Sequence, residues 1–278
     1  MLFLYNKEEL RDYFSFIDSV KEAVEKPFFT SSQVKGWCDF CGTISLMKNE
    51  ISQDDQWINR RGQFICNSCG LSARLRSFYS ALKAYTKPGF NCIIYEKASL
   101  FYHRLSSKYN YYLGTEYFED YSLGQEVKHN NLLIRNEDIM STTFCDNTFD
   151  LVAHQEVLEH VPEPELALQD NFRILKDGGH LIFTTPFYHH LAKTIVNATV
   201  DNGKVIHLQK PIYHGNPLSE EGALVFQLFG QSFLDIFFDI GFSKAWVGFD
   251  FDISRCIFSC GNPYPVGQMH PVIFFGKK

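Results

Sequence analysis

The chain has 278 residues, which is long enough for one large domain plus a small appendage, with a core that needs no cross-links. Its formal charge of -6, with no block of consecutive basic residues, makes nucleic acid an unfavoured partner. No apolar stretch is long enough to cross a bilayer, and the acidic, helical segment Met1–Lys26 lacks the features of a secretory signal. We therefore expect a cytoplasmic protein without a membrane span.

The first part of the chain predicts a helix followed by a small module. Residues 7–25 place apolar side chains at helical intervals, which predicts an amphipathic packing helix that ends near Pro27. The character of the sequence changes at Ser31, just before two pairs of cysteines. A second helical pattern then runs from Arg74 through Tyr85.

Beyond the turn at Lys87-Pro88-Gly89, short apolar strands alternate with helices. This alternation predicts an α/β fold with a largely parallel sheet that is covered on both faces. Ligands in such sheets bind beyond the carboxyl ends of the strands. The predicted strands are 91–95, 111–115, 150–153 and 180–184, and the predicted helices are 99–107, 163–174 and, after a long loop, 231–240.

Four of the eight cysteines form two Cys-x-x-Cys pairs, Cys38 with Cys41 and Cys66 with Cys69, each followed by a glycine. Two intervening residues allow a turn to aim both thiolates at one ion, and the glycine permits the backbone to turn. The other cysteines are scattered, which favours metal binding in a reducing compartment over disulfides. The pattern predicts a structural Zn²⁺ ribbon; unrelated cysteine pairs or a redox dithiol are the alternatives.

The surroundings of the ribbon carry two further expectations. Its apolar core is expected to come from Trp37, Trp57 and Phe64. Four arginines lie near it in the sequence, and they form either a solvated basic face or a site for an anionic substrate. These arginines are Arg60, Arg61, Arg74 and Arg76.

The second half of the chain contains a series of motifs in order: Asn136-Glu137-Asp138-Ile139, FDLV at 149–152, EVLEH at 156–160, and LKDGGHL at 175–181. Together these resemble class I S-adenosylmethionine-dependent methyltransferases of the small-molecule type, over residues 91 to about 190. The resemblance implies a Rossmann-like, doubly wound, mostly parallel seven-stranded sheet in a domain over 74–278. An N-terminal helix over 1–30 and the zinc ribbon over 31–73 would precede it.

The resemblance also assigns residues to the S-adenosylmethionine site. Glu116 matches the acid that binds the ribose, because a carboxylate can accept hydrogen bonds from paired hydroxyls. Asp138, with the backbone of Ile139, matches the contact to the adenine edge. The remaining positions lie beside the sulfonium or within the following motif, and they are His154, Gln155, Glu156 and His160.

The first strand is followed by Glu96-Lys97-Ala98-Ser99, where most relatives carry a glycine-rich loop. The chain resembles, in this respect, a subgroup of zinc-ribbon methyltransferases associated with surface glycan genes, in which the first loop has a Glu-x-x-Ser character. In that subgroup Glu96 would face the methionine ammonium and Ser99 would cap the next helix. A non-catalytic protein that has lost the cofactor is the alternative interpretation of this loop.

The expected reaction is methyl transfer to a hydroxyl or amine of a sugar or another small polar acceptor. Transfer to a hydroxyl requires removal of its proton, and histidine has a suitable pKa near neutrality. The candidate bases are His214 and His207, with His189 as a further candidate, although positioning alone can also drive the transfer. An RNA methyltransferase that uses the ribbon as a reader is the alternative enzyme.

Overall fold

The computed structural model describes residues 1–49, 60–216, 218–258 and 270–278, so the predicted core residue Trp57 lies outside the described residues. The backbone forms two compact units. The first contains 1–84, 187–191 and 246–273. The second contains 85–186, 192–245 and 274–278.

The first unit draws together segments that the predicted boundary at 73/74 separated. The buried guanidinium of Arg76 donates hydrogen bonds to the carbonyl oxygens of Arg255 at 2.6 Å and Phe64 at 3.0 Å. Arg255 in turn forms ion pairs with Asp39 and Asp250, each at 2.8 Å. These contacts join the ribbon, the following helix and the segment 246–273, which explains why the unit is larger than the predicted ribbon module.

The N-terminal helix of this unit is α1, Lys7–Phe29. It begins where the Asn6 side chain accepts a hydrogen bond from the Glu9 N–H at 3.0 Å. Leu10, Phe14 and Ile17 form its buried stripe. The helix continues past Pro27 to Phe29, so its predicted end was early; proline removes one backbone donor but keeps a helical φ.

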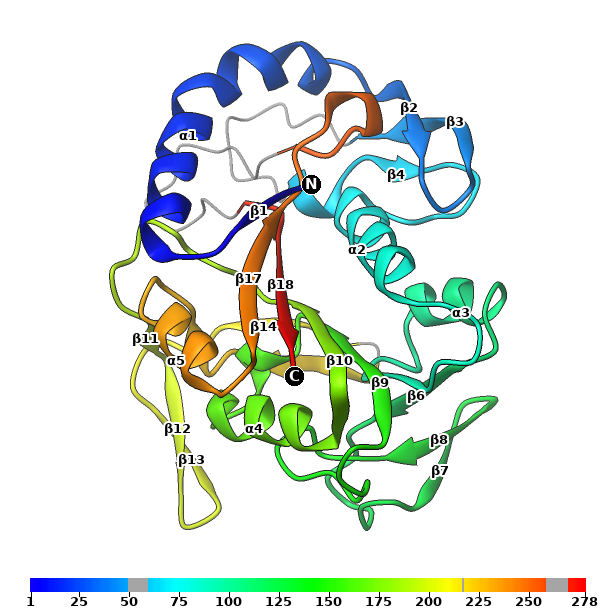
Figure 1. Cartoon of the computed structure of the whole chain (residues 1–278), viewed down its shortest axis with the longest axis vertical. Helices are drawn as coiled ribbons and strands as arrows, with labels where there is room; N and C mark the ends of the chain where they lie inside the picture. Colours follow the sequence, from blue (N-terminus) through cyan, green and yellow to red (C-terminus); the bar gives the residue numbers. More distant parts are fainter. Residues whose placement is uncertain (50–59, 217, 259–269) are drawn as a thin grey trace. The chain divides into compact units, whose positions relative to one another are not determined.

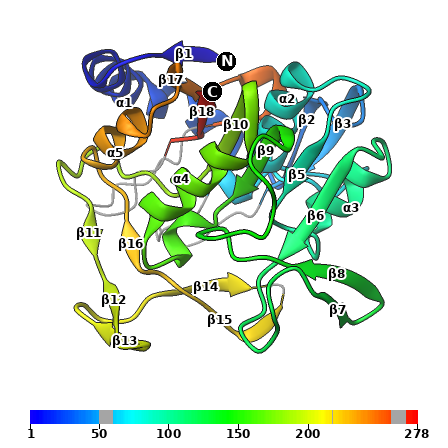
Figure 2. The same cartoon turned by 60° about the horizontal axis from the view of Figure 1, so that its bottom comes forward.

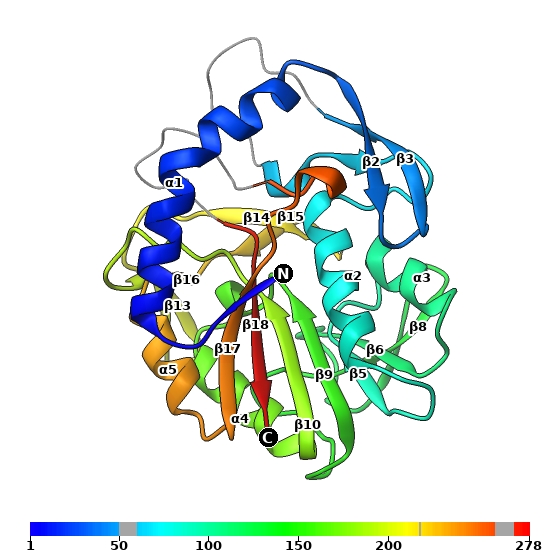
Figure 3. The same cartoon turned by 45° about the horizontal axis from the view of Figure 1, so that its top comes forward.

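The ribbon is a three-stranded antiparallel sheet, of which β2 and β3 are labelled at the upper right of Figure 3. Phe64 is fully buried, as expected, whereas Trp37 is 43% exposed. The expectation for Trp37 was wrong because alternate strand residues face opposite ways, and on its strand Gly36 and Cys38 are the buried ones. The strands are β2 Gln33–Cys38, β3 Thr43–Lys48 and β4 Ile65–Cys66.

The second unit is built on the mostly parallel sheet that the sequence predicted (Figure 1). Strands β9 and β10 run parallel at its centre, β5, β6 and β8 continue it in parallel on one side, and β18 joins antiparallel on the other. The strands are β5 Cys92–Ile94, β6 Tyr112–Glu116, β7 Glu126–His129, β8 Leu132–Asn136, β9 Phe149–Gln155, β10 Leu175–Thr184, β17 Lys244–Phe249 and β18 Val272–Lys277.

The strand order, β17-β18-β10-β9-β5-β6-β8-β7, contains a reversal between β5 and β9. The chain moves outward from β5 through β6 to β8 and then returns to the other side of β5 to form β9. Such a topological switch point opens a crevice at the carboxyl ends of the strands. The sheet exceeds the seven predicted strands because β7 pairs antiparallel with β8 and β1, Leu2–Leu4, pairs with the end of β17.

The predicted helices are confirmed to within a few residues. Ser99 is the N-cap of α3, where its hydroxyl oxygen accepts from the Tyr102 N–H at 3.0 Å. The helices are α2 Ala73–Tyr85, α3 Leu100–Ser106, α4 Pro164–Ile174 and α5 Phe233–Asp239. Short 3₁₀ turns are η1 Arg60–Gly62, η2 Leu158–His160 and η3 Ile253–Arg255.

The segment between β10 and α5, predicted as a long loop, instead contains three two-stranded ladders (Figure 2). Their strands are β11 Ile195–Val196, β12 Ala198–Asp201, β13 Lys204–His207, β14 Tyr213–Asn216, β15 Ser219–Leu224 and β16 Gln227–Leu228. Across the described ranges, no helix has the length and apolarity that a bilayer crossing requires.

Candidate functional site

The switch point between β5 and β9 carries a hydrogen-bonded group of predicted cofactor residues. Gln155, the last residue of β9, donates from its side-chain amide to Glu96 Oε1 at 2.8 Å. The Ser99 hydroxyl donates to Glu96 Oε2, also at 2.8 Å. The two strand ends are therefore joined by a carboxylate whose oxygens both have defined partners, and the turn is built without glycine.

Glu116 ends the neighbouring strand β6 and faces the same loop. Its Oε1 accepts from the Ala98 N–H at 2.7 Å. Burial raises the pKa of Glu116 to about 7, although this backbone hydrogen bond acts in the opposite direction. A half-buried carboxylate with this pKa ionises readily once further donors, such as hydroxyl groups, bind to it.

Asp138 follows β8 and is held close to the end of β6. The N–H of its neighbour Glu137 donates to the backbone carbonyl of Glu116 at 2.9 Å. Asp138 Oδ1 accepts from the Met140 N–H at 2.9 Å, and burial raises the pKa of Asp138. Ile139 is buried beside it. The loops after β5, β6 and β8 thus bring three acids to one edge of the sheet.

These residues fit the chemistry of S-adenosylmethionine. The cofactor presents two ribose hydroxyls, an exocyclic amine and an ammonium group, all of which are hydrogen-bond donors. The side chains gathered here are carboxylates and an amide, which offer the matching acceptors. The negative charge of Glu96, Glu116 and Asp138 also suits a ligand that carries a sulfonium and an ammonium.

Two other predicted cofactor residues lie differently. His154 is fully buried, stacks on Phe183 with ring centroids 4.8 Å apart, and contacts Asn171 of α4. Burial lowers the pKa of His154 to about 3, so the ring is a neutral packing element. Glu156 has the left-handed φ of 52°, a conformation that turns the chain sharply after β9.

His160 and His214 lie beside a buried carboxylate, Glu159, and we call these three residues the Glu159 cluster. The Glu159 side chain is 1% exposed, and the hydroxyl of Thr185 donates to its Oε2 at 2.9 Å. Its Oε1 lies 3.5 Å from His160 Nε2 and 3.6 Å from His214 Nδ1. Glu159 and Thr185 follow β9 and β10, so the cluster lies at the carboxyl ends of these strands.

The other two candidate bases are not in this cluster. His207 ends β13, and all the residues of this strand are exposed. His189 belongs to the first unit, where its Nε2 lies 2.9 Å from Asp18 Oδ2 and its ring contacts His270 at a centroid distance of 4.5 Å. His207 and His189 are not part of the Glu159 cluster, whereas His214 is.

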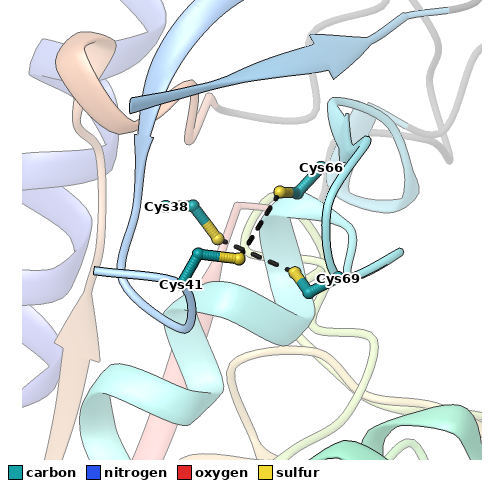
Figure 4. A group of neighbouring side chains, drawn as sticks. All are labelled: Cys38, Cys41, Cys66 and Cys69. Atoms are coloured by element: carbon teal, nitrogen blue, oxygen red, sulfur yellow. Dashed lines mark hydrogen bonds between the residues drawn. The ribbon is translucent and has the colours of Figure 1, made fainter. Parts of the chain in front are cut away.

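The four paired cysteines converge on one point in the first unit (Figure 4). The Sγ atoms of Cys38 and Cys69 are 3.7 Å apart, and those of Cys41 and Cys66 are 4.0 Å apart. A tetrahedral zinc ion with Zn–S bonds of about 2.3 Å separates its sulfurs by about 3.8 Å. The cysteine side chains therefore fit a four-thiolate zinc site.

Two of the arginines near the ribbon are buried rather than solvated. Arg76 is 0% exposed and Arg61 is 3% exposed. The Arg76 guanidinium donates to backbone carbonyl oxygens, so it stabilises the unit instead of binding a ligand. The expectation of a basic surface was wrong for these two residues, and the support that they lent to an RNA acceptor is removed.

In a comparison with known protein families, residues 100–183 match the family model described as "Methyltransferase domain". This segment spans α3, β6, β8, β9, α4 and most of β10, and includes Glu116, Asp138 and the Glu159–His160 pair. Residues 100–183 are therefore similar to methyltransferase domains. The matched residues include two of the acids at strand ends, Glu116 and Asp138.

The chain is also similar to individual proteins. A ubiquinone biosynthesis O-methyltransferase of Vibrio cholerae is 44% identical over 39 residues, which are 14% of this chain and 16% of that protein. A solved S-adenosylmethionine-dependent methyltransferase of Thermotoga maritima, described as a possible histamine N-methyltransferase, is 18% identical and covers 73% of this chain and 89% of its own, with a TM-score of 0.40. One from Mesorhizobium loti is 14% identical and covers 72% and 97%, with a TM-score of 0.45.

Sequence reasoning missed Glu159 and Thr185 as site residues of the methyltransferase domain. Glu159 lies in the EVLEH motif directly before His160, yet its spacing alone does not reveal that β14 brings His214 to the same carboxylate. Thr185 follows β10 in a Thr-Thr-Pro segment. An acidic residue adjacent to a histidine, just past a parallel strand, is the signal that was present in the sequence.

Proposed function

We propose that the protein transfers a methyl group from S-adenosylmethionine to a hydroxyl, or an amine, of a sugar or another small polar acceptor, such as a glycan component. The observation that carries the proposal is the hydrogen bond between Glu96 and Gln155 across the switch point, with Glu116 at the end of the adjacent strand. Loops at this edge position ligands in doubly wound sheets. The glycine-free first loop is then an alternative way of building the site.

Each acid would hold a different part of the cofactor. Glu116 would accept hydrogen bonds from the ribose hydroxyls, and Asp138 with the backbone at Ile139 would accept from the adenine amine. Glu96, held by Gln155 and Ser99, would face the methionine ammonium. The left-handed turn at Glu156 would let the backbone after β9 pass close to the sulfonium. We leave the packed ring of His154 out of this set.

The acceptor would meet the Glu159 cluster. When bound, S-adenosylmethionine supplies a methyl carbon that the acceptor oxygen attacks, while the carbon–sulfur bond breaks with its electron pair going to sulfur and the hydroxyl proton is released. His160 and His214 are the groups of this cluster that are able to take up or redirect that proton. The short match to an O-methyltransferase supports oxygen as the receiving atom.

The four-cysteine site would hold a structural zinc ion. Because protein thiolates fill all four positions, the ion would have no open position for a substrate or water and would act on folding alone. The pKa of Cys38 is lowered to about 5, since its thiolate accepts a hydrogen bond from Cys69, which favours an anionic sulfur at this site.

Calorimetry with S-adenosylhomocysteine tests the proposed function without knowledge of the acceptor. The wild-type protein should bind the ligand, and Glu96→Gln should bind it at least about tenfold more weakly, because a charged hydrogen-bond acceptor is lost. Glu119→Gln changes an exposed acid of the loop after β6 and serves as the matched control. Absence of binding to the wild-type protein would reject a methyltransferase function and favour the non-catalytic alternative.

A further inference from the structure

The Glu159 cluster has a feature that hydrogen bonding within the cluster does not explain. Two imidazole nitrogens lie 3.5 Å and 3.6 Å from the same carboxylate oxygen, Glu159 Oε1. A histidine–carboxylate hydrogen bond is typically about 2.7–2.9 Å long. Among the described residues, this buried oxygen has no hydrogen-bond partner.

The hydrogen bond of His160 shows which of its ring nitrogens carries a proton. His160 Nδ1 lies 2.8 Å from the carbonyl oxygen of Leu224. A carbonyl oxygen only accepts, so Nδ1 carries the proton and, in the neutral ring, Nε2 presents its lone pair toward Glu159 Oε1. In this neutral form two electron-rich atoms face each other across 3.5 Å, an arrangement that a cation bound between them would stabilise.

The distances fit ligands that share one cation. The three ligand atoms of Glu159, His160 and His214 lie within 4.8 Å of one another. Ligand bonds of about 2.1 Å in a tetrahedral arrangement separate neighbouring donor atoms by about 3.4 Å. Two imidazoles and one carboxylate form a set that divalent transition metals bind while keeping open positions.

The surrounding contacts hold these atoms in place. The Thr185 hydroxyl holds Glu159 Oε2, and the Leu224 carbonyl fixes the ring of His160, which are the kinds of support that metal ligands have in known sites. The Phe226 N–H also donates to the Glu159 backbone carbonyl at 2.7 Å, so the chain after β15 is fastened to η2. The rings of His160 and His214 are nearly perpendicular, with centroids 5.0 Å apart.

We propose that Glu159, His160 and His214 bind a divalent transition-metal ion. The consequence for catalysis rests on the proposed function: a cation at the ends of β9 and β10 would bind an acceptor oxygen, or two neighbouring oxygens of a diol, and lower the pKa of the hydroxyl. His214 would then act as a ligand of the ion, and the proton would pass to water. The preferred acceptor would be a molecule with adjacent oxygen atoms.

The test uses Co²⁺ and protein whose four-cysteine site has been filled with Zn²⁺. Calorimetry should show a single further Co²⁺ site, and the visible spectrum should have the d–d bands of nitrogen and oxygen ligands without thiolate charge-transfer bands. Glu159→Gln should weaken Co²⁺ binding about 10–100-fold, and His103→Asn, a change of an exposed histidine on α3, should have no effect.

Three results would overturn the inference: no Co²⁺ binding to the zinc-filled wild type, equal binding to Glu159→Gln, or loss of binding in Asp18→Asn, which would place the ion at the Asp18–His189–His270 group of the first unit. Calorimetry of Glu159→Gln with S-adenosylhomocysteine checks that this variant is folded. Binding of S-adenosylhomocysteine but not of Co²⁺ by the wild-type protein would reject the metal site and keep the proposed function. The converse result would reject the function and keep the metal site.

Discussion

Glu116 is expected to make the cofactor-free protein less stable as the pH rises. Burial raises the pKa of this carboxyl from its ordinary value of 4.5 to about 7. A carboxyl group that binds its proton more tightly in the folded state than in the unfolded state stabilises the fold while it is protonated. This contribution is lost when the group ionises. The folded protein is therefore favoured fully below about pH 4.5, and this advantage is lost as the pH rises toward 7.

The size of the effect follows from the pKa change. Each pKa unit corresponds to about 1.4 kcal/mol, so ionising Glu116 in the folded protein costs on the order of 3 kcal/mol above about pH 7. Glu116→Gln removes the titration and keeps an oxygen that can accept from the Ala98 N–H. The variant should be more stable than the wild type by about this amount at alkaline pH, and by much less at about pH 5.

Urea unfolding at several pH values measures the difference, with Glu119→Gln as the exposed control. In calorimetry, Glu116→Gln should bind S-adenosylhomocysteine about 10–100-fold more weakly than the wild type, because the ribose hydroxyls lose a charged acceptor. Wild-type affinity should fall as the pH drops below 7, since Glu116 must lose its proton to bind. A stability difference that does not change with pH would refute the argument that burial raises this pKa.

Three further changes test other parts of the structure. Cys69→Ser should lower the zinc content by about one ion per chain, measured with a chromogenic chelator, while the exposed Cys145→Ser leaves it unchanged. Arg76→Met should lower the free energy of unfolding by at least about 3 kcal/mol in urea titrations, because buried carbonyl oxygens lose a charged donor. His154→Phe should make the protein less sensitive to acid, because His154 has a folded-state pKa of about 3 and an ordinary value of 6.5. The wild type should lose about 2 kcal/mol relative to this variant between about pH 6.5 and pH 5.

Each of these expectations has a contrary outcome. Unchanged zinc content in Cys69→Ser would remove the four-thiolate assignment. A cost for Arg76→Met no larger than that of Arg104→Met, a change on the exposed part of α3, would show that the buried guanidinium contributes little. Equal acid sensitivity of His154→Phe and the wild type would mean that the ring takes up its proton without leaving its place beside Phe183.

The parallel core and its cofactor edge were predictable because their signals are local. Apolar runs of strand length alternated with helical patterns, and Glu96 and Glu116 each followed one of those runs in the sequence. Asp138 was assigned from the resemblance, because the strand before it, β8, was not among the predicted strands. Parallel strands bring such residues to one edge by topology, so their proximity follows once the strands are identified. Ser99 was recognisable as a cap for the same local reason.

The rest depended on contacts between distant segments. Nothing near Glu159 in the sequence indicates that a residue on β14 will face it, and the ladders that carry His214 are too short and polar for a periodic signal. Histidines look alike in a sequence, yet His154 is packed against Phe183 while His160 faces a carboxylate. Long-range packing decides which role each ring has, and composition does not contain it.

The bond between Arg76 and the carbonyl of Arg255 also sets an order of events during synthesis. These residues are 179 positions apart, so the carbonyl that accepts from the Arg76 guanidinium is made long after the cysteine strands. The first unit therefore cannot be complete before residue 255 has been made, although its cysteine strands emerge early. A chain that stops before residue 255 would leave the buried Arg76 guanidinium without this partner, and we expect its first unit to be less stable.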